Sequence, residues 1–154
     1  MDGIVGVHGI NDNELVNKAF LATGACQHRG KASCGLAIGN GHGIYVNKGL
    51  GRIAEVIDYN IVRTFQDLRP VAAIGNIGYT KRKIAEKVNA EPIEIFPRRE
   101  SALQLVLTMD GYLITDEDLV ADLDSEYMFQ TDNKTEVMGA LLHKYLCEEG
   151  IGFQ

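Results

Sequence analysis

The chain has 154 residues, of which 45% are hydrophobic and 23% charged, enough for one domain with a substantial core and too few for two ordinary domains. A formal net charge of −6 and the lack of a long basic run argue against binding to nucleic acid or to an anionic membrane surface. Small molecules or other proteins are therefore the expected partners.

The cysteine pattern and the start of the chain indicate the compartment. Cys26, Cys34 and Cys147 form no C-x-x-C pair and cannot all be bridged with one another, which favours a reducing cytosol. The first residues contain no basic leader segment, and no stretch approaches the ~18 apolar residues of a membrane span. We therefore expect a cytoplasmic protein with an uncleaved start and no membrane attachment.

The hydrophobic pattern predicts a strand, a helix and a hairpin in the first third of the chain. The apolar run at 4–8 is bounded by glycines and predicts a buried strand. Apolar residues recur at three- and four-residue intervals over 15–26, which predicts an amphipathic helix ending near Gly30. Residues 34–38 and 43–46 flank a Gly-Asn-Gly turn and predict a β-hairpin.

The rest of the chain mixes predicted helices and strands. In chain order they are an interrupted helix at 53–65, a strand at 71–79, a charged helical segment at 81–88, a central strand at 102–108, a helix at 116–123 capped by Thr115, a strand at 127–130 and a last amphipathic helix at 137–146. Because strands and helices do not alternate one for one, the pattern predicts an α+β layered domain.

Seven short motifs follow one another in a fixed order. They are Gly-Ile-Val-Gly at 3–6, Cys-Gln-His-Arg-Gly-Lys-Ala-Ser-Cys-Gly at 26–35, Asn-Lys-Gly-Leu-Gly at 47–51, Gly-Asn-Ile-Gly-Tyr at 75–79, Asn-Ala-Glu-Pro at 89–92, Met-Asp-Gly at 109–111 and Thr-Asp-Asn-Lys-Thr-Glu at 131–136. This order resembles class II glutamine amidotransferases, most of all the glutaminase domain of amidophosphoribosyltransferase. That family shows C-G-I-V-G, Q-H-R-G-x-x-S-x-G, a lysine-glycine turn, G-H-x-R-Y, N-A-Q-P, H-N-G and S-D-T-E.

The resemblance implies a four-layer αββα sandwich of the N-terminal-nucleophile hydrolase type, with two antiparallel sheets face to face between helices. It implies one glutaminase-like domain over residues 1–154, with the site at the start of the first strand. Because the family's domain is generally longer, we expect either a chain truncated at its C-terminus or a missing layer supplied by an oligomeric partner. The family also relates the chain to purine biosynthesis.

The departures from the family fall on the chemistry. Asp2 stands at the position of the nucleophilic cysteine, and a carboxylate is a far weaker nucleophile toward an amide. An acidic second residue usually keeps Met1 in place, one residue beyond the family's catalytic amine. Gly78 replaces the arginine that clamps the glutamine carboxylate. Asp110 replaces an oxyanion-hole asparagine, a donor worth about 2.7–4 kcal/mol, and Gly111 beside it is unchanged.

The resemblance also marks where substrate would bind. The substrate-binding positions are Gly78, Tyr79, Asn89 and Asp132. Asp132 matches the aspartate that holds the substrate amine, although two extra residues, Asn133 and Lys134, follow it. Carboxylates about 4 Å apart, as Asp2 and Asp110 would be, repel by ~4 kcal/mol at an effective dielectric of ~20. Without an arginine to offset them, the pocket is expected to reject free glutamine.

Other interpretations of these residues stay open. Residues 27–30 suit a scaffold turn at a helix end, and Asp2 with Asp110 suits either solvated acids or a cation site. Residues 49–54 match a dinucleotide-binding fingerprint, which the amidotransferase pattern explains better. The thiols at 26 and 34 suit core packing better than a replacement nucleophile. Because the histidines share no ligand-like spacing, neither a metal nor a cofactor is expected.

Two functions follow from this pattern. The first is a pseudoenzyme, a binding or assembly module that keeps the glutaminase fold without the reaction and works with a protein partner, a further copy of itself or a small-molecule ligand. The alternative is a divergent active glutaminase subunit that supplies ammonia to a synthase or phosphoribosyltransferase partner. An unrelated α+β binding domain is disfavoured by the seven ordered motifs.

Overall fold

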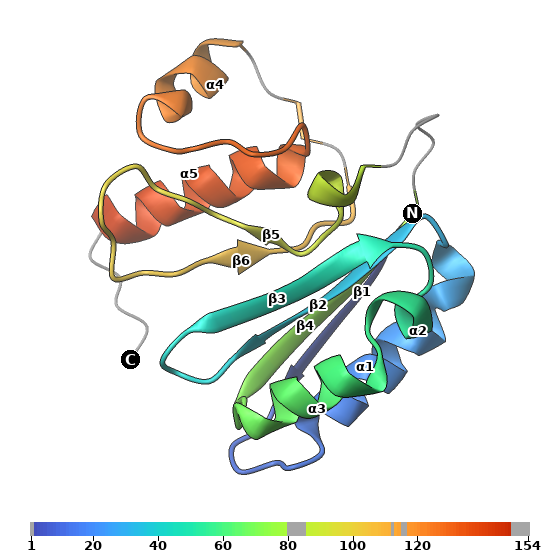
Figure 1. Ribbon diagram of the computed structural model, residues 1–154. Coiled ribbons are helices and arrows are strands. Elements are labelled where there is room, and N and C mark those ends of the chain that lie inside the picture. Colours follow the sequence, from blue (N-terminus) through green and yellow to red (C-terminus); the bar gives the residue numbers. More distant parts are fainter. Residues whose placement is uncertain (1, 80–85, 112, 115–116, 149–154) are drawn as a thin grey trace.

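The computed structural model describes residues 2–79, 86–111, 113–114 and 117–148 (Figure 1). In chain order the elements are β1 (Gly3–His8), α1 (Leu15–Ala25), the 3₁₀ helix η1 (Cys26–Arg29), β2 (Ser33–Gly39), β3 (Ile44–Leu50), α2 (Ile53–Val56), α3 (Tyr59–Asp67), β4 (Ala72–Gly78), the 3₁₀ helix η2 (Lys87–Asn89), β5 (Ile93–Glu94), β6 (Val106–Leu107), α4 (Glu117–Asp124) and α5 (Lys134–Glu148). Among these described residues, no helix is both long and apolar enough to cross a membrane.

The larger sheet of the described chain has the strand order β1-β4-β2-β3, and every neighbouring pair is antiparallel. β2 and β3 form a hairpin in which Cys34 lies opposite Gly49. β4 lies between β1 and β2, with Ile77 opposite both Gly3 and Cys34. The predicted opening strand, the hairpin and the strand at 71–79 are confirmed.

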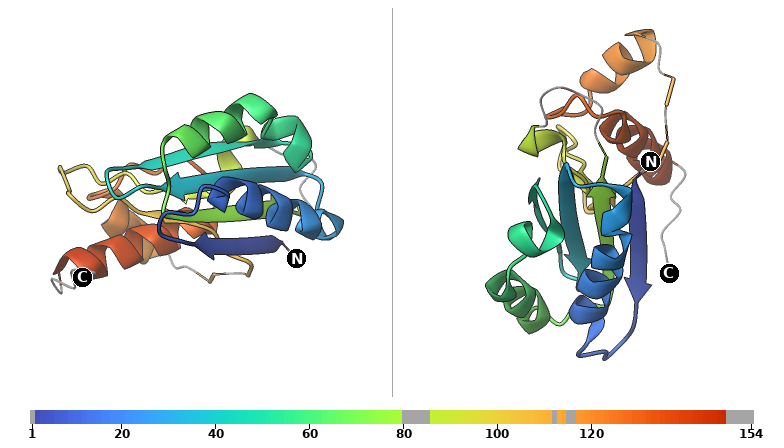
Figure 2. Two further views of the ribbon diagram at one scale, coloured as in Figure 1. Left: turned by 90° about the horizontal axis from the view of Figure 1, so that it is seen from below. Right: turned by 90° about the vertical axis from the view of Figure 1, so that its right-hand side faces the viewer.

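Helices α1, α2 and α3 cover one face of this sheet, as two views show (Figure 2). On β2 the alternate residues Cys34, Leu36 and Ile38 are all buried in the core under these helices, as the two-residue period of a strand requires. On α1 the spacing of Leu15, Val16 and Ala19 places them in the same core. The amphipathic patterns seen in the sequence therefore build the first two layers.

The second sheet, β5 with β6, and the helices α4 and α5 lie on the other face (Figure 1). Their own core contains Ile93, Ile95, Leu123, Tyr127, Val137 and Ala140. The layers thus run helix, sheet, sheet, helix, which confirms the αββα architecture and the α+β class. The second sheet is the smaller one, because its strands are two residues long in the described chain.

Two strand predictions were wrong. The run at 102–108 forms a strand only at Val106–Leu107, and 127–130 makes only an isolated bridge from Tyr127 to Pro97. At both places single cross-strand main-chain bonds form, from the Ile95 N–H to the Leu105 carbonyl at 3.1 Å and from the Met128 N–H to the Phe96 carbonyl at 2.8 Å, and side-chain contacts lie beside them. The Ser101 hydroxyl accepts from the Leu103 N–H at 3.2 Å, and the Tyr127 hydroxyl lies 2.9 Å from Nδ1 of the buried His143.

Two helix predictions need refinement. The segment at 53–65 divides into α2 and α3, because the Asp58 carboxylate accepts the Ile61 N–H at 2.9 Å and starts a new helix. Most of the segment predicted at 81–88 lies outside the described residues, and its end belongs to η2. The helix predicted at 116–123 is α4, and Thr115, its predicted cap, lies outside the described part.

Candidate active site

Asp2 lies at the start of β1 and is held by groups from three distant segments. Its carboxylate Oδ1 accepts the Tyr79 N–H at 2.8 Å. Its own N–H donates to Asp110 Oδ1 at 3.0 Å, and its carbonyl oxygen accepts from Arg29 Nε at 2.7 Å. The side chain and the main chain of Asp2 are therefore both engaged at the position where the sequence predicted the site.

Arg29 offsets one of the two carboxylates, that of Asp110, so the expectation that no arginine lies beside them is wrong. Besides its bond to Asp2, the Arg29 guanidinium lies 3.4 Å from Asp110 Oδ2. The two side chains are 36% and 32% exposed, so solvent only partly screens this ion pair. Arg29 reaches the site because η1 turns the chain back toward β1 directly after α1. The motif at 27–30 thus contributes a site residue, which its interpretation as a scaffold turn missed.

Other residues of that motif make scaffold contacts. Gln27 Nε2 donates to the Gly30 carbonyl at 2.6 Å, and Gln27 Oε1 accepts the Ile53 N–H at 2.9 Å. Gly30 permits the close approach of this turn to the end of β4, since a Cβ there would lie 2.5 Å from the carbonyl oxygen of Gly78 and 2.9 Å from the nitrogen of Tyr79. The turn therefore supports the main chain that holds Asp2.

Gly78, Tyr79 and Gly111 border the Asp2 cluster. Gly78 is buried at the end of β4, and a Cβ on it would meet the Ser33 hydroxyl. Tyr79 uses its N–H on Asp2 while its side chain is 53% exposed. Gly111 is exposed, and a Cβ added to it would have no atom of the described residues within 4 Å. The structure brings Gly78 and Tyr79 to Asp2 and places Gly111 beside Asp110.

Asn89 and Asp132 lie together on a second loop pair. The Asp132 N–H donates to Asn89 Oδ1 at 3.0 Å. Asn133, one of the two extra residues, donates from Nδ2 to the Asn89 carbonyl at 3.1 Å. Asn133 therefore takes part in holding Asn89 next to Asp132 rather than separating them.

Known proteins of similar sequence identify the family. No protein-family model matches the chain. The amidophosphoribosyltransferase of Archaeoglobus fulgidus is 32% identical over 152 residues, which are 97% of this chain and 32% of that protein. The glutamine–fructose-6-phosphate aminotransferase of Geobacillus kaustophilus is 29% identical over 149 residues, 95% of this chain and 22% of that protein. The chain is a class II glutamine amidotransferase domain. It spans about a third or less of the length of these relatives.

Solved structures agree with this assignment of the glutamine amidotransferase domain. The structure of the allosteric regulatory enzyme of purine biosynthesis covers 100% of the chain with a TM-score of 0.75 at 24% identity, which bears on the fold alone. The glutamine phosphoribosylpyrophosphate amidotransferase of B. subtilis covers 94% of it, with a TM-score of 0.70 at 25% identity. The chain spans 30% and 29% of those two proteins. The N-terminal-nucleophile hydrolase fold is thereby confirmed.

Glu91 is a buried acid near the candidate site that the sequence motifs did not single out as a site residue. Its side chain is buried at 6% exposure, yet its carboxylate is well satisfied. Thr108 Oγ1 donates to Oε2 at 2.6 Å and Thr135 Oγ1 donates to Oε1 at 2.5 Å. Its position in the Asn-Ala-Glu-Pro motif, where the family pattern has glutamine, was the available signal.

Lys48, which lies in strand β3 where the family pattern has a lysine-glycine turn, reaches the same region. Its Nζ donates to the Val88 carbonyl at 3.2 Å. Burial lowers the pKa of Lys48, and the nearby carboxylates of Glu94, Glu136 and Glu91 act in the opposite direction. Lys48 thus brings a positive charge toward the buried acids between the two sheets.

Two of the thiols, Cys26 and Cys34, lie on the face of the larger sheet that the helices α1 to α3 cover. Cys34 is fully buried in the first core, and burial, followed by the charge of Glu55, raises its pKa to about 12. Cys26 packs against the start of β1, where a Cβ on Gly3 would lie 2.6 Å from its Cβ. In the described ranges, no group of three or more histidine, cysteine, aspartate or glutamate residues is placed to hold a metal ion.

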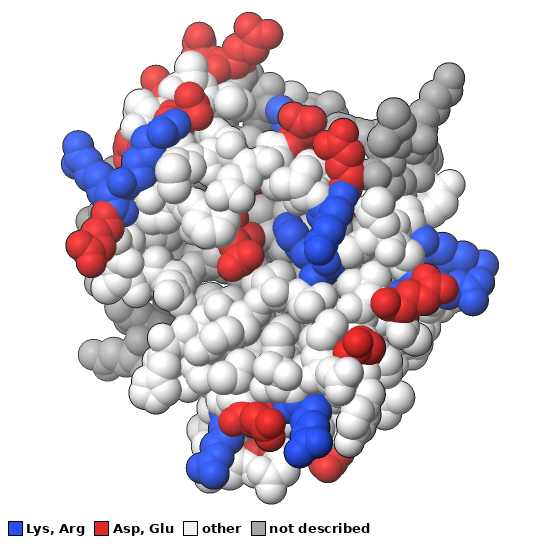
Figure 3. Space-filling model, in the orientation of Figure 1, with Lys and Arg blue, Asp and Glu red and all other residues white. Residues whose placement is uncertain are grey.

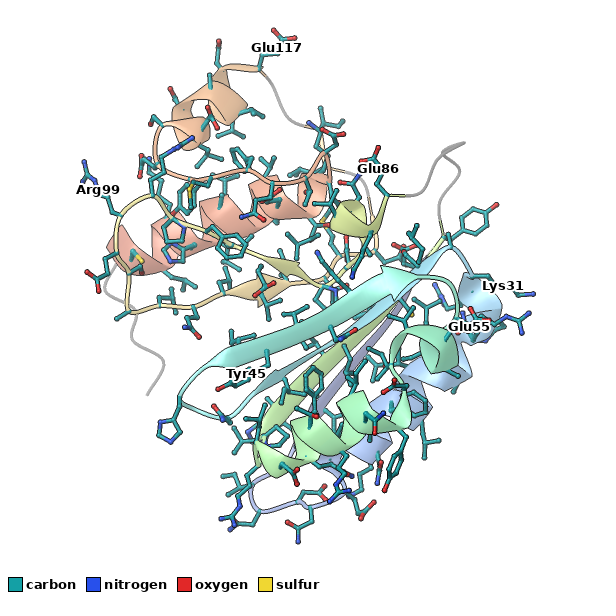
Figure 4. The ribbon with its side chains drawn as sticks, viewed as in Figure 1. Lys31, Tyr45, Glu55, Glu86, Arg99 and Glu117 are labelled. Carbon is teal, nitrogen blue, oxygen red and sulfur yellow. The ribbon has the colours of Figure 1, made fainter. Side chains whose placement is uncertain are left out.

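The charged surface is uneven. Acidic side chains gather over α4, which carries Glu117, Asp118, Asp122 and Asp124 (Figure 3). Glu117 and Arg99 project outward from the second helix and sheet layers, whereas Lys31 and Glu55 lie together at one end of the larger sheet (Figure 4). The α4 end of the domain is therefore strongly acidic.

Proposed function

We propose that this glutamine amidotransferase domain is a non-catalytic binding or assembly module. The proposal rests on the hydrogen bonds of Asp2 at the nucleophile position. The Tyr79 N–H donates to its carboxylate, its own N–H donates to Asp110, and its carbonyl accepts from Arg29. A carboxylate that accepts a main-chain hydrogen bond is a poorer nucleophile still than a free one, and an amide is a resistant target.

The oxyanion side supports the same proposal. A catalytic oxyanion hole needs donors aimed at the developing charge. Asp110 instead accepts, on Oδ1 from the Asp2 N–H and on Oδ2 from Arg29. An oxyanion near Asp110 would therefore meet a negative charge. Loss of both the nucleophile and this donor fits retention of the fold for binding.

We propose that the module works in the cytoplasm with a protein partner or with further copies of itself. Such a contact would cover exposed large apolar side chains, among them Tyr145 and Ile4, which are 56% and 43% exposed. A small-molecule ligand at the Asn89 and Asp132 loops is compatible with this role, since those loops keep an ordered polar arrangement.

A divergent active glutaminase is the second candidate. It is favoured by Gly111, which is carried over intact, and by the similarity to the A. fulgidus amidophosphoribosyltransferase over 97% of the chain. Such a subunit would hydrolyse glutamine and deliver ammonia to a synthase or phosphoribosyltransferase partner.

Glutamine hydrolysis by the purified chain decides between the two candidates. Ammonia release is followed together with mass spectrometry of the N-terminus. The proposal predicts no turnover and retention of Met1. Turnover that is abolished by Asp2→Ala would overturn it and identify Asp2 as a new nucleophile.

Restoration of the family residues gives a second test. The triple variant Asp2→Cys, Gly78→Arg and Asp110→Asn supplies a thiol, a carboxylate clamp and an oxyanion donor. The new side chain at position 78 requires the Ser33 hydroxyl to rotate away. Recovery of glutaminase activity would show that the rest of the site survives, whereas absence of activity in a folded variant favours long-standing repurposing.

A further inference from the structure

The buried carboxylate of Glu91 lies between two loops that each carry an acid of the candidate site. On one side, Oε2 accepts the Met109 N–H at 2.8 Å, and Met109 directly precedes Asp110. On the other side, Oε1 accepts from Asn133 Nδ2 at 3.1 Å, and Asn133 directly follows Asp132. One side chain therefore contacts the neighbours of both acids.

The same carboxylate is anchored to both sheet layers. Asn76, from the middle of β4 in the larger sheet, directs its Nδ2 to Glu91 Oε2 at 3.4 Å and to Thr108 Oγ1 at 2.8 Å. Thr135 Oγ1, from the first turn of α5, donates to Oε1. These contacts restrict the carboxylate to one orientation, because each oxygen has donors from a different layer.

We infer that Glu91 is a positioning residue that couples the Asp110 loop to the Asp132 loop of the candidate site. The inference rests on the proposed function, since the site that Glu91 positions is the binding site proposed above. A change at either loop is transmitted to the other through the two oxygens of one buried carboxylate.

The donors around Glu91 require a carboxylate rather than an amide. Met109 offers a main-chain N–H, which cannot reverse its polarity. Asn133 is fixed as well, because its Oδ1 accepts the Thr135 N–H at 3.0 Å while its Nδ2 serves both Glu91 and the Asn89 carbonyl. A glutamine at position 91 would face a donor with its own NH₂ group in either orientation.

The coupling pairs two departures from the family pattern. Glu91 stands where that pattern has glutamine, and Asn133 is one of the two extra residues after Asp132. In the structure, Nδ2 of Asn133 donates to Oε1 of Glu91. The contact satisfies an acid that would otherwise be buried with one oxygen less well paired, so the two departures support each other.

The coupling is tested by recording the amide signals of the full chain by NMR, without added ligand. Asn133→Ala, at a half-buried side chain, removes one donor from Oε1 together with the Asn133 contacts to the Asn89 carbonyl and the Thr135 N–H. We expect the signals of the Met109 N–H, on the far loop, and of the Asp2 N–H, which donates to Asp110 on that loop, to shift along with that of Asp132. Shifts confined to residues that touch Asn133 would overturn the inference.

A rescue pair separates positioning from a general structural role. Asn133→Asp alone sets two carboxylates against each other and should shift the Met109 signal strongly. Adding Glu91→Gln lets the new amide NH₂ at position 91 donate to the new carboxylate at position 133. The Met109 signal should then return toward its unmodified position. Failure of the double variant to restore it, in a folded protein, contradicts the coupling.

A remote stability control completes the experiment. Asp58→Ala removes the cap of α3, far from both loops, and lowers the thermal midpoint without touching Glu91. Its Met109 and Asp2 signals should stay in place; equal shifts in this variant would show that loosening of the fold, not coupling, moves them. Glutamine turnover by the unmodified chain would overturn the proposed function but not the coupling, because the signals are recorded without substrate.

Discussion

Arg29 and Asp110 meet at 3.4 Å although 81 residues separate them in the chain. The same guanidinium holds the carbonyl of Asp2 at 2.7 Å. One side chain thus ties the start of β1 to the loop after β6. The pair offsets the charge of Asp110, while the Asp2 carboxylate accepts the Tyr79 N–H.

Arg29→Met should lower the free energy of unfolding by about 1–2 kcal/mol, because it removes a charged donor from two partly buried acceptors. Urea denaturation measures the change. Arg98→Met is the matched control, since Arg98 likewise donates from Nε to a carbonyl and pairs with a carboxylate, both of Asp124, but at side chains 45% and 60% exposed. We expect a smaller loss there, and an equal loss would show that the site contact adds nothing.

Gly30→Ala should destabilise the domain by about 1–3 kcal/mol, the usual cost of overpacking. The new Cβ would lie 2.5 Å from the Gly78 carbonyl, and main chain cannot rotate away as a side chain can. Gly6→Ala, in β1, has no atom within 4 Å of the added Cβ among the described residues and should change stability little. Similar urea midpoints for both variants would contradict the close approach at Gly30.

The stability of the chain should depend on Asp12 in a defined pH range. A hydrogen bond from Lys18 at 2.7 Å, followed by the Glu14 N–H, lowers the pKa of Asp12 below its ordinary value of 3.8. A lowered folded-state pKa stabilises the protein above 3.8, and this contribution is lost as the pH falls through the folded-state pKa. Asp12→Asn should therefore be less stable than the unmodified chain at pH near 7.

The Asp12 prediction is checked by urea midpoints at several pH values. The gap between the unmodified chain and Asp12→Asn should begin to shrink below pH of about 4 and close as the pH falls through the lowered folded-state pKa, below which Asp12 is protonated in both states. Lys18→Met should remove most of the same pH dependence, because Lys18 is the principal cause of the shift. A gap that stays constant on acidification would rule out this linkage.

The three cysteines should differ sharply in reactivity. Cys34 is buried with a pKa raised to about 12, so its thiolate is scarce at neutral pH, whereas Cys147 is exposed. Iodoacetamide at pH near 8 should label Cys147 first and leave Cys34 unlabelled until the chain unfolds, as peptide mass spectrometry can show. Rapid native labelling of Cys34 would contradict its burial.

The residues that periodicity could predict are those whose neighbours are local. The β2–β3 hairpin follows from its turn, and α1 follows from its apolar face. The run at 102–108 was overestimated because apolar character alone does not show that Ser101 and His143 compete for its contacts. Local pattern thus predicted the large sheet better than the small one.

The candidate site was predicted as positions but not as contacts. The ordered motifs predicted that Asp2 and Asp110 lie at one site, and a hydrogen bond joins the two residues in the structure. Arg29 was missed because a basic residue at a helix end has a sufficient local explanation. Glu91 was missed because burial of an acid depends on donors up to 44 residues away, which no local pattern encodes.

The Asp2 cluster closes loops of 27, 77 and 108 residues with hydrogen bonds to a single residue. Contacts of such long sequence separation form only after much of the chain has been ordered. No isolated helix or hairpin of this protein can assemble the cluster. Slow exchange of both the Tyr79 and the Asp2 amide protons would therefore report complete folding, because the first bonds β4 to the start of β1 and the second bonds β1 to the loop after β6.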